Sequence, residues 1–113
     1  MVDICRPYSM RNGQITYFKS PNYPHDLLQP IKCQCNVTGQ NISAEVYEHQ
    51  KSKNSTVVFM FVTNKVTIHV NDVTIRNRML FSEMDYVQLI LDNRIYQELF
   101  KLWMKISGNG KLI

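Results

Sequence analysis

A chain of 113 residues is long enough for one domain with one hydrophobic core. Hydrophobic residues make up 44% of it and charged residues 19%, which excludes a disordered chain. The longest apolar run, residues 57–62, is too short to cross a bilayer, and the net charge of +4 is a mild basic bias. We therefore expect a single domain over residues 1–113, without membrane insertion.

The N-terminal residues carry no recognisable secretory signal. Residues 1–5 have neither a basic segment nor the apolar stretch that follows one in a signal peptide. Two expectations remain open from this observation: an intracellular chain, or a secreted chain from which the signal has already been removed.

The segment Lys19–Pro24, which reads Lys-Ser-Pro-Asn-Tyr-Pro, lies between Cys5 and Cys33. Its two prolines fix the backbone φ angle and cannot donate to a regular strand ladder. Each proline also drives the residue before it into an extended conformation. The segment is therefore predicted to form a rigid corner between strands.

This segment resembles the signature of a CUB domain, an extracellular β-sandwich module with a Ser-Pro-Asn-Tyr-Pro stretch between two disulfide-bonded cysteines. Upstream, residues 13–15 resemble the Gly-x-Ile strand of the family. Downstream, Cys33 and Cys35 stand where the family has Cys-x-Trp. The resemblance covers about a third of the chain, and beyond residue 46 it extends only to the pattern of strands.

The resemblance implies an all-β fold, an antiparallel β-sandwich of jelly-roll type. It also implies a Cys5–Cys33 disulfide, with Cys35 in the place of a core aromatic residue. Because the cysteine count is odd, one thiol must stay free or pair elsewhere, and a reduced cytosolic chain remains an alternative.

Three Asn-x-Ser/Thr triplets point to a secretory context, since N-glycosylation occurs only there. Fewer would be expected by chance in a chain with this many asparagines. The predicted acceptors are Asn36, Asn41 and Asn54. Together with the cysteines they favour a secreted or extracellular chain.

Alternation of apolar and polar residues predicts several strands. Residues 42–46 and 87–91 alternate with one apolar face, whereas residues 57–62 are apolar on both faces, as in a strand covered on each side. Residues 66–70 are predicted to turn at Asn71-Asp72 into a hairpin with residues 73–75. Residues 92–93 should end a strand, and residues 107–110 should form a turn.

The segment 93–106 fits two structures. Apolar residues recur at helical spacing from Ile95 to Ile106, but residues 100–106 also alternate as a strand with Lys101, Trp103 and Lys105 on the second face. Because the CUB resemblance implies a strand near the C-terminus, we expect a strand from about residue 99 and a loop or short turn over 93–98.

The chain offers little for catalysis or metal binding. His25, His49 and His69 form no ligand pair at metal-binding spacing and are each expected at the surface, and Cys35 is expected to be a small buried residue. We therefore expect that the chain is not an enzyme. The tyrosine of the calcium-binding CUB subgroup is missing after Pro24, and lysines stand at 51 and 53 where acidic ligands are required, so no calcium site and no cofactor are expected.

The remaining function is recognition. The densest basic points should lie on loops and attract an extracellular protein or an acidic glycan, with one tyrosine beside them; the predicted partner-binding residues are Lys51, Lys53, Arg76, Arg78 and Tyr23. Phe59, Phe61 and Phe81 lie in apolar runs and are expected in the core, which argues against base stacking. The alternative is a small intracellular β-barrel that binds nucleic acid, for which basic residues and exposed aromatics should share one face.

Overall fold

The structure is a computed structural model that describes residues 2–4 and 15–112. Its described part contains strands and connections and no helix, so the prediction of an all-β fold is confirmed. The strands are β1 (Val2–Asp3), β2 (Thr16–Lys19), β3 (Ile31–Lys51), β4 (Val58–Thr63), β5 (Thr67–His69), β6 (Thr74–Asn93) and β7 (Phe100–Leu112). No helix in this described part is long and apolar enough to cross a membrane.

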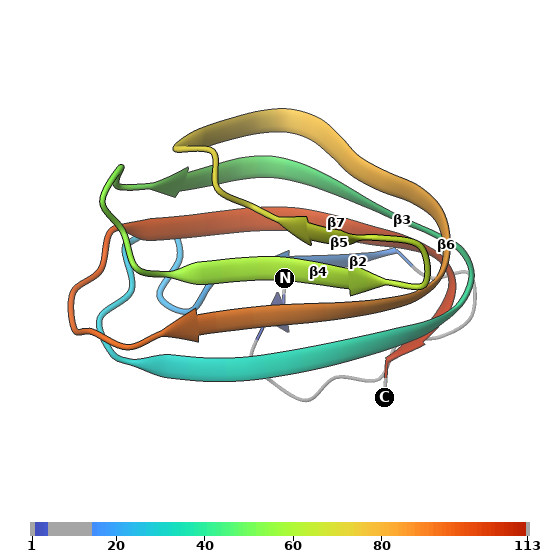
Figure 1. The fold of residues 1–113 in the computed structure, drawn as a ribbon, viewed down its shortest axis with the longest axis horizontal. Helices are drawn as coiled ribbons and strands as arrows, with labels where there is room; N and C mark the ends of the chain where they lie inside the picture. Colours follow the sequence, from blue (N-terminus) through green and yellow to red (C-terminus); the bar gives the residue numbers. More distant parts are fainter. Residues whose placement is uncertain (1, 5–14, 113) are drawn as a thin grey trace.

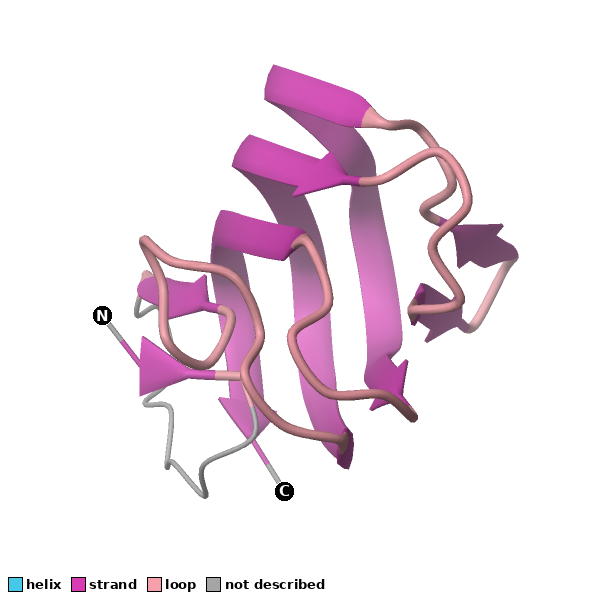
Figure 2. Cartoon of the chain, turned by 90° about the vertical axis from the view of Figure 1, so that its left-hand side faces the viewer, coloured by secondary structure: helices cyan, strands magenta, loops and turns pink. Residues whose placement is uncertain are grey.

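The strands form one hydrogen-bonded sheet in the order β1-β2-β7-β3-β6-β4-β5 (Figure 1). The β1–β2 pair is parallel, and the other pairs are antiparallel. Three of the strands, β3, β6 and β7, are much longer than the others. The sheet bends strongly along these long strands, as the curved ribbons in Figure 2 show.

The bend follows from local breaks in the ladder. The register of β3 shifts between Thr38 and Ile42, and Asn41 has a φ of 54°. On the neighbouring β6, Glu83 has a φ of 60°. Such bulges increase the local twist and turn a strand without ending it.

The bend divides the sheet into two halves. The β4 half contains β5, β4, residues 86–93 of β6 and residues 31–38 of β3. The β7 half contains residues 74–84 of β6, residues 42–51 of β3, residues 100–107 of β7, and β2 and β1.

Aromatic contacts show that the two halves face each other. The ring of Phe59 on β4 lies 6.0 Å from that of Phe100 on β7 and 6.3 Å from that of His49 on β3. The rings of Phe61 and Phe81 lie 5.2 Å apart. Because β4 neighbours neither β7 nor β3 in the sheet, the contacts of Phe59 require the sheet to fold back over one core. The jelly-roll order of a CUB-like sandwich stays a prediction.

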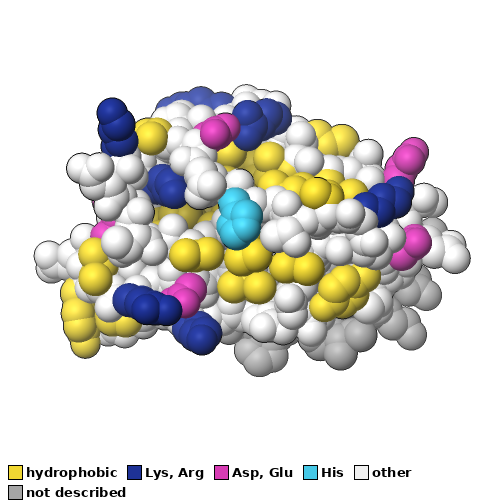
Figure 3. Space-filling view, in the orientation of Figure 1, with side chains coloured by type: hydrophobic (Ala, Val, Ile, Leu, Met, Phe, Trp, Pro, Cys, Tyr) yellow, Lys and Arg dark blue, Asp and Glu magenta, His cyan; other side chains and the backbone are white. Residues whose placement is uncertain are grey.

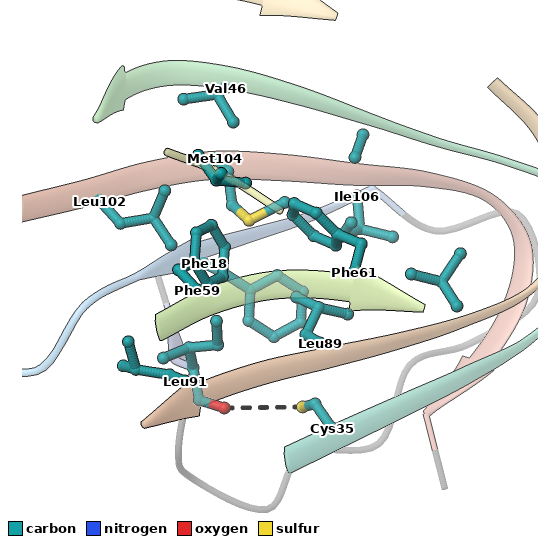
Figure 4. Packing of buried hydrophobic residues seen from close by; sticks show 14 of the residues in the cluster. Phe18, Cys35, Val46, Phe59, Phe61, Leu89, Leu91, Leu102, Met104 and Ile106 are labelled. Atoms are coloured by element: carbon teal, nitrogen blue, oxygen red, sulfur yellow. Dashed lines mark hydrogen bonds between the residues drawn. The ribbon is translucent and has the colours of Figure 1, made fainter. Parts of the chain in front are cut away.

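The core lies between the halves, and Figure 4 shows its central side chains. The inward sides of the predicted strands 42–46 and 87–91 are buried, as is the alternating side of β7; these residues are Ile42, Ala44, Val46, Val87, Leu89, Leu91, Leu102, Met104 and Ile106. Phe59, Phe61 and Phe81 are buried as predicted. The strand prediction from about residue 99 is also confirmed, with residues 94–99 as a loop.

Three predictions about the strands are wrong. Residues 66–70 do not form a hairpin with 73–75, because β5 pairs with β4, and residues 70–73 cross to the other half. Residues 107–110 are not a terminal turn, because β7 continues to Leu112. The run 57–62 is covered on one face only, since Val58 is exposed and Met60 is partly exposed.

Glycine at position 108 is required by the bend. A Cβ atom there would lie 2.7 Å from the Asn41 carbonyl oxygen, and the φ angle is 132°. Residues other than glycine rarely adopt this φ angle, and the backbone of β3 cannot easily move away. Gly108 thus lets β7 continue past the point where β3 turns.

Candidate recognition site at the loop end

Three connections gather at one end of the molecule, on the left of Figure 1, and face the viewer in Figure 2. They are residues 20–30, 52–57 and 94–99. The opposite end carries the bends of the long strands. Loops held by a rigid sheet are the usual place for binding residues, so this end is the first place to look for a function.

The Lys19–Pro24 segment forms the predicted corner, and two hydrogen bonds fix it to β7. The Ser20 amide donates to the Leu102 carbonyl at 2.9 Å, and the Leu102 amide donates to the Ser20 hydroxyl at 3.0 Å. Successive turns follow, in which the Tyr23 amide donates to the Ser20 carbonyl and the His25 amide to the Asn22 carbonyl. The corner is therefore a defined structure rather than a loose loop.

The loop 94–99 is joined to this corner by backbone and side-chain hydrogen bonds. The Leu27 amide donates to the Glu98 carbonyl at 3.1 Å, and the Gln97 amide donates to the Leu28 carbonyl at 3.2 Å. The Asn93 side-chain amide donates to the carbonyl of Gln29 at 3.1 Å and to that of Ile95 at 2.9 Å. The two loops therefore present one continuous surface.

A hollow of about 350 Å³ lies between these loops. Its polar side chains include Asp26 and Lys101, whose carboxylate Oδ1 and ammonium Nζ atoms are 3.9 Å apart. Asp26 Oδ1 is buried and accepts no hydrogen bond from the described residues. The residues lining the hollow are Asn22, His25, Asp26, Leu27, Leu28, Gln97 and Lys101.

Large apolar side chains stand exposed beside the hollow. Tyr96 is 72% exposed and Leu28 is 55% exposed, and the neighbouring Ile95 and Leu99 are also exposed. Single exposed apolar residues are common, but here they stand on two loops that are hydrogen-bonded to each other. We call Leu28, Ile95, Tyr96 and Leu99, with the hollow, the loop-end surface.

The predicted basic residues do not form one site. Lys51 is not on a loop: it ends β3, is 8% exposed, and its amide donates to the Val73 carbonyl. Arg76 and Arg78 are exposed but lie on β6, and Arg78 is paired with Asp72 at 3.0 Å. Lys53 is exposed in the 52–57 connection as predicted. Figure 3 shows positive and negative side chains scattered over the face of the molecule that is seen in Figure 1.

Tyr23 is placed by β3 rather than by basic residues. Its hydroxyl donates to Glu48 Oε2 at 2.9 Å. The pKa of Tyr23 is raised mainly by burial and secondly by this hydrogen bond to the carboxylate. The phenol is therefore held neutral against the sheet.

Two of the three predicted glycosylation acceptors are accessible. Asn41 lies exposed at the bend of β3, and Asn54 lies exposed in the 52–57 connection. Asn36 lies within β3 and is partly buried.

Cys35 is buried, as expected, and its thiol lies 3.6 Å from the Ile4 carbonyl oxygen. Burial raises the pKa of this thiol, which is free. Cys5, Gly13 and Gln14 lie outside the described residues, so the Cys5–Cys33 bridge stays a prediction.

Among the histidines, one expectation is wrong. His25 and His69 are exposed, but His49 is completely buried. Neither of its ring nitrogens has a hydrogen-bond partner within the described residues. In the same part of the chain, no three His, Cys, Asp or Glu residues converge as metal ligands.

Sequence reasoning missed the apolar part of the loop-end surface. The loop predicted over residues 93–98 could have revealed it, because a loop gives Ile95 and Tyr96 no strand face on which to be buried.

Comparison with family models, curated proteins and solved structures finds no match for this chain. The resemblance to CUB domains therefore stays a prediction from the sequence.

Proposed function

We propose that the chain is a non-catalytic extracellular recognition module, a divergent CUB-like domain, which binds a protein partner through its loop-end surface. The observation that carries the proposal is the exposed group of apolar side chains around Tyr96, beside a hollow lined by the Asp26–Lys101 ion pair. The module could stand alone or belong to a larger secreted or membrane-anchored protein.

The chemistry of the loop-end surface favours a protein over an acidic glycan. Tyrosine and leucine side chains form the buried centres of protein interfaces, in which a few anchors contribute most of the affinity. An acidic glycan would require unpaired basic residues, whereas Lys101 lies beside Asp26 and Lys51 is buried. The exposed Lys53 remains available to steer an acidic partner during encounter.

The dispersal of titratable groups supports a non-catalytic role. His25 lines the hollow, His49 lies in the core, and His69 lies on β5. General acid–base chemistry needs such groups within hydrogen-bond reach of one another or of a substrate. The accessible acceptors Asn41 and Asn54 support the extracellular assignment.

The test is a binding screen of the full chain against an array of purified extracellular proteins. Replacing Tyr96 by Ala and Leu28 by Ser should abolish or strongly weaken the binding of the partner, because both side chains would lie at the centre of the interface. Val66→Ser is the matched control, since Val66 is similarly exposed but lies in the β4–β5 connection. All variants should keep the same midpoint of thermal unfolding.

An equal loss of binding with Val66→Ser, or full binding by the Tyr96 and Leu28 variant, would refute the assignment of the loop-end surface. Binding that is instead lost on charge reversal at Arg76 and Arg78 would place the interface on the edge of β6.

A further inference from the structure

A second group of aromatic residues lies on the outer face of the β7 half, away from the core. Tyr17 comes from β2, Trp103 from β7 and Tyr47 from β3. The rings of Tyr17 and Tyr47 are 6.3 Å apart and inclined by only 26°, and those of Tyr47 and Trp103 are 5.0 Å apart. We call these three residues the aromatic platform.

The strand pattern places these rings outside. On β7, Trp103 alternates with Leu102 and Met104, which are completely buried. On β3, a register shift between Val46 and Glu48 leaves Tyr47 and Glu48 both pointing outward. Tyr17 is 41% exposed, so solvent reaches the platform at its β2 side.

Charged residues surround the platform in compensating pairs. Lys105 Nζ lies 3.7 Å from Glu45 Oε2, Lys101 Nζ lies 3.9 Å from Asp26 Oδ1, and Lys19 pairs with Asp3. Glu48, opposite Trp103, accepts the Tyr23 hydroxyl hydrogen bond. Arg76 of β6 lies opposite Glu48 in the strand register, so the described groups around the platform are three lysines, one arginine and four carboxylates, without net charge.

This charge balance decides between kinds of ligand. A nucleic acid or a sulfated glycan gains affinity from unpaired cations, but each lysine here has a carboxylate beside it. A protein interface excludes charged groups from its centre, because burying them is costly even when they are paired. A ligand without net charge but with many hydroxyl groups can hydrogen-bond these ions and leave them solvated.

The rings supply the second requirement of such a ligand. The apolar C–H faces of a sugar ring pack on the face of an aromatic side chain, while its hydroxyl groups reach the polar groups at the edge of the ring. Tyr17 and Tyr47 stack on each other, so Tyr17, which is 41% exposed, is the ring that a sugar unit can reach.

We propose that the aromatic platform binds an uncharged oligosaccharide, with a sugar ring stacked on Tyr17 and hydroxyl groups bonded to the Lys105–Glu45 pair. Tyr17 and the Lys105–Glu45 pair lie outside the loop-end surface, with which the platform shares only the neighbouring Lys101–Asp26 pair, and sugar binding does not require the protein partner proposed there.

The test uses Trp103 as its own probe, because it is the one tryptophan of the chain. The full chain is titrated with uncharged oligosaccharides, including cellotetraose, maltotetraose, mannotetraose and chitotetraose, and tryptophan fluorescence is recorded. At least one should change the fluorescence in a saturable manner, with an affinity that does not fall as salt is raised. Tyr17→Ala should weaken this binding about tenfold, the loss of one aromatic contact.

Two variants serve as controls. Tyr17→Phe keeps the ring and should retain most of the affinity, and Tyr96→Ala changes the loop-end surface alone and should retain all of it. The absence of a saturable change with every uncharged oligosaccharide would overturn the proposal. A response only to a heparin fragment or to a single-stranded oligonucleotide, weakened by salt, would overturn it in favour of an acidic ligand. Unchanged affinity in Tyr17→Ala would overturn the assignment to the platform.

Discussion

His49 should make the stability of the fold depend on pH between about 4 and 6.5. Its side chain is completely buried between Phe59 and Phe100, and neither ring nitrogen has a hydrogen-bond partner within the described residues. The pKa of His49 is lowered from 6.5 to about 4. Burial is the main cause, and the positive charges of Lys51 and Arg78 act in the same direction. The Asp72 carboxylate and the Asp72 backbone both oppose the decrease.

The sign of the effect follows from which state binds the proton. Above pH 6.5 the imidazole is neutral in both the folded and the unfolded chain, so it contributes no pH dependence. Between pH 6.5 and about 4 the unfolded chain binds a proton that the folded chain does not, and the free energy of unfolding decreases as the pH falls. The difference between the two pKa values corresponds to about 3 kcal/mol by pH 4, since one pKa unit equals about 1.4 kcal/mol.

The assay is urea unfolding of the wild type and of His49→Leu at a series of pH values. Subtracting the two curves removes the contribution of the carboxylates, which titrate in both proteins. The variant should be at least as stable at neutral pH, because it removes two buried nitrogens without partners, and it should lack the decrease of about 3 kcal/mol. His69→Gln is the control, since His69 is exposed and its replacement should leave the curve unchanged.

Equal pH dependence in the wild type and in His49→Leu would refute this reasoning. A histidine NMR titration of the folded chain that placed the pKa of His49 near 6.5 would refute it directly, because the ring would then be hydrated or paired.

Four further outcomes are expected. Gly108→Ala should destabilise the fold by ~2 to 3 kcal/mol in urea unfolding, because the new Cβ would meet the Asn41 carbonyl oxygen; a smaller effect would mean that the bend can relax. The Cys35 thiol should resist alkylation in the folded chain and react on unfolding, because it is buried with a raised pKa, and mass spectrometry would reveal rapid native labelling if this is wrong. Peptide mapping without reduction should give a Cys5–Cys33 linkage, and a Cys5–Cys35 linkage would contradict it. Calcium should leave the thermal unfolding midpoint unchanged, whereas a rise would reveal a site.

Regular alternation made much of the fold predictable. Residues 42–46, 87–91 and 100–106 each have one apolar side, and that side faces the core. The pairing of the strands was less accessible, because Asn71-Asp72 has the composition of a tight turn but lies in a crossing between the two halves. Strand length was also underestimated, since Gly108 and Asn41 mark bends at which the strands continue.

The positions of His49 and Lys51 have a single cause. With strict alternation from the buried Val46, residues 49 and 51 would point outward. The register shift between Val46 and Glu48 places two consecutive residues outside and therefore turns His49 and Lys51 inward. A bulge of this kind has no clear mark in the local sequence, so a loop position for Lys51 and a surface position for His49 were both predicted incorrectly. The outward Tyr47 of the aromatic platform arises from the same shift.

The long strands have a consequence for how the molecule opens. β3 and β6 are paired with each other in both halves. If one half unfolded, the other half would therefore lose part of the strands that form it. We expect the amides of Val37 and Val46, one in each half, to exchange with deuterium at the same rate and only through global unfolding. The strands also pair residues far apart in the chain, which predicts slow folding, in milliseconds or longer, with a single kinetic phase from the two halves forming together.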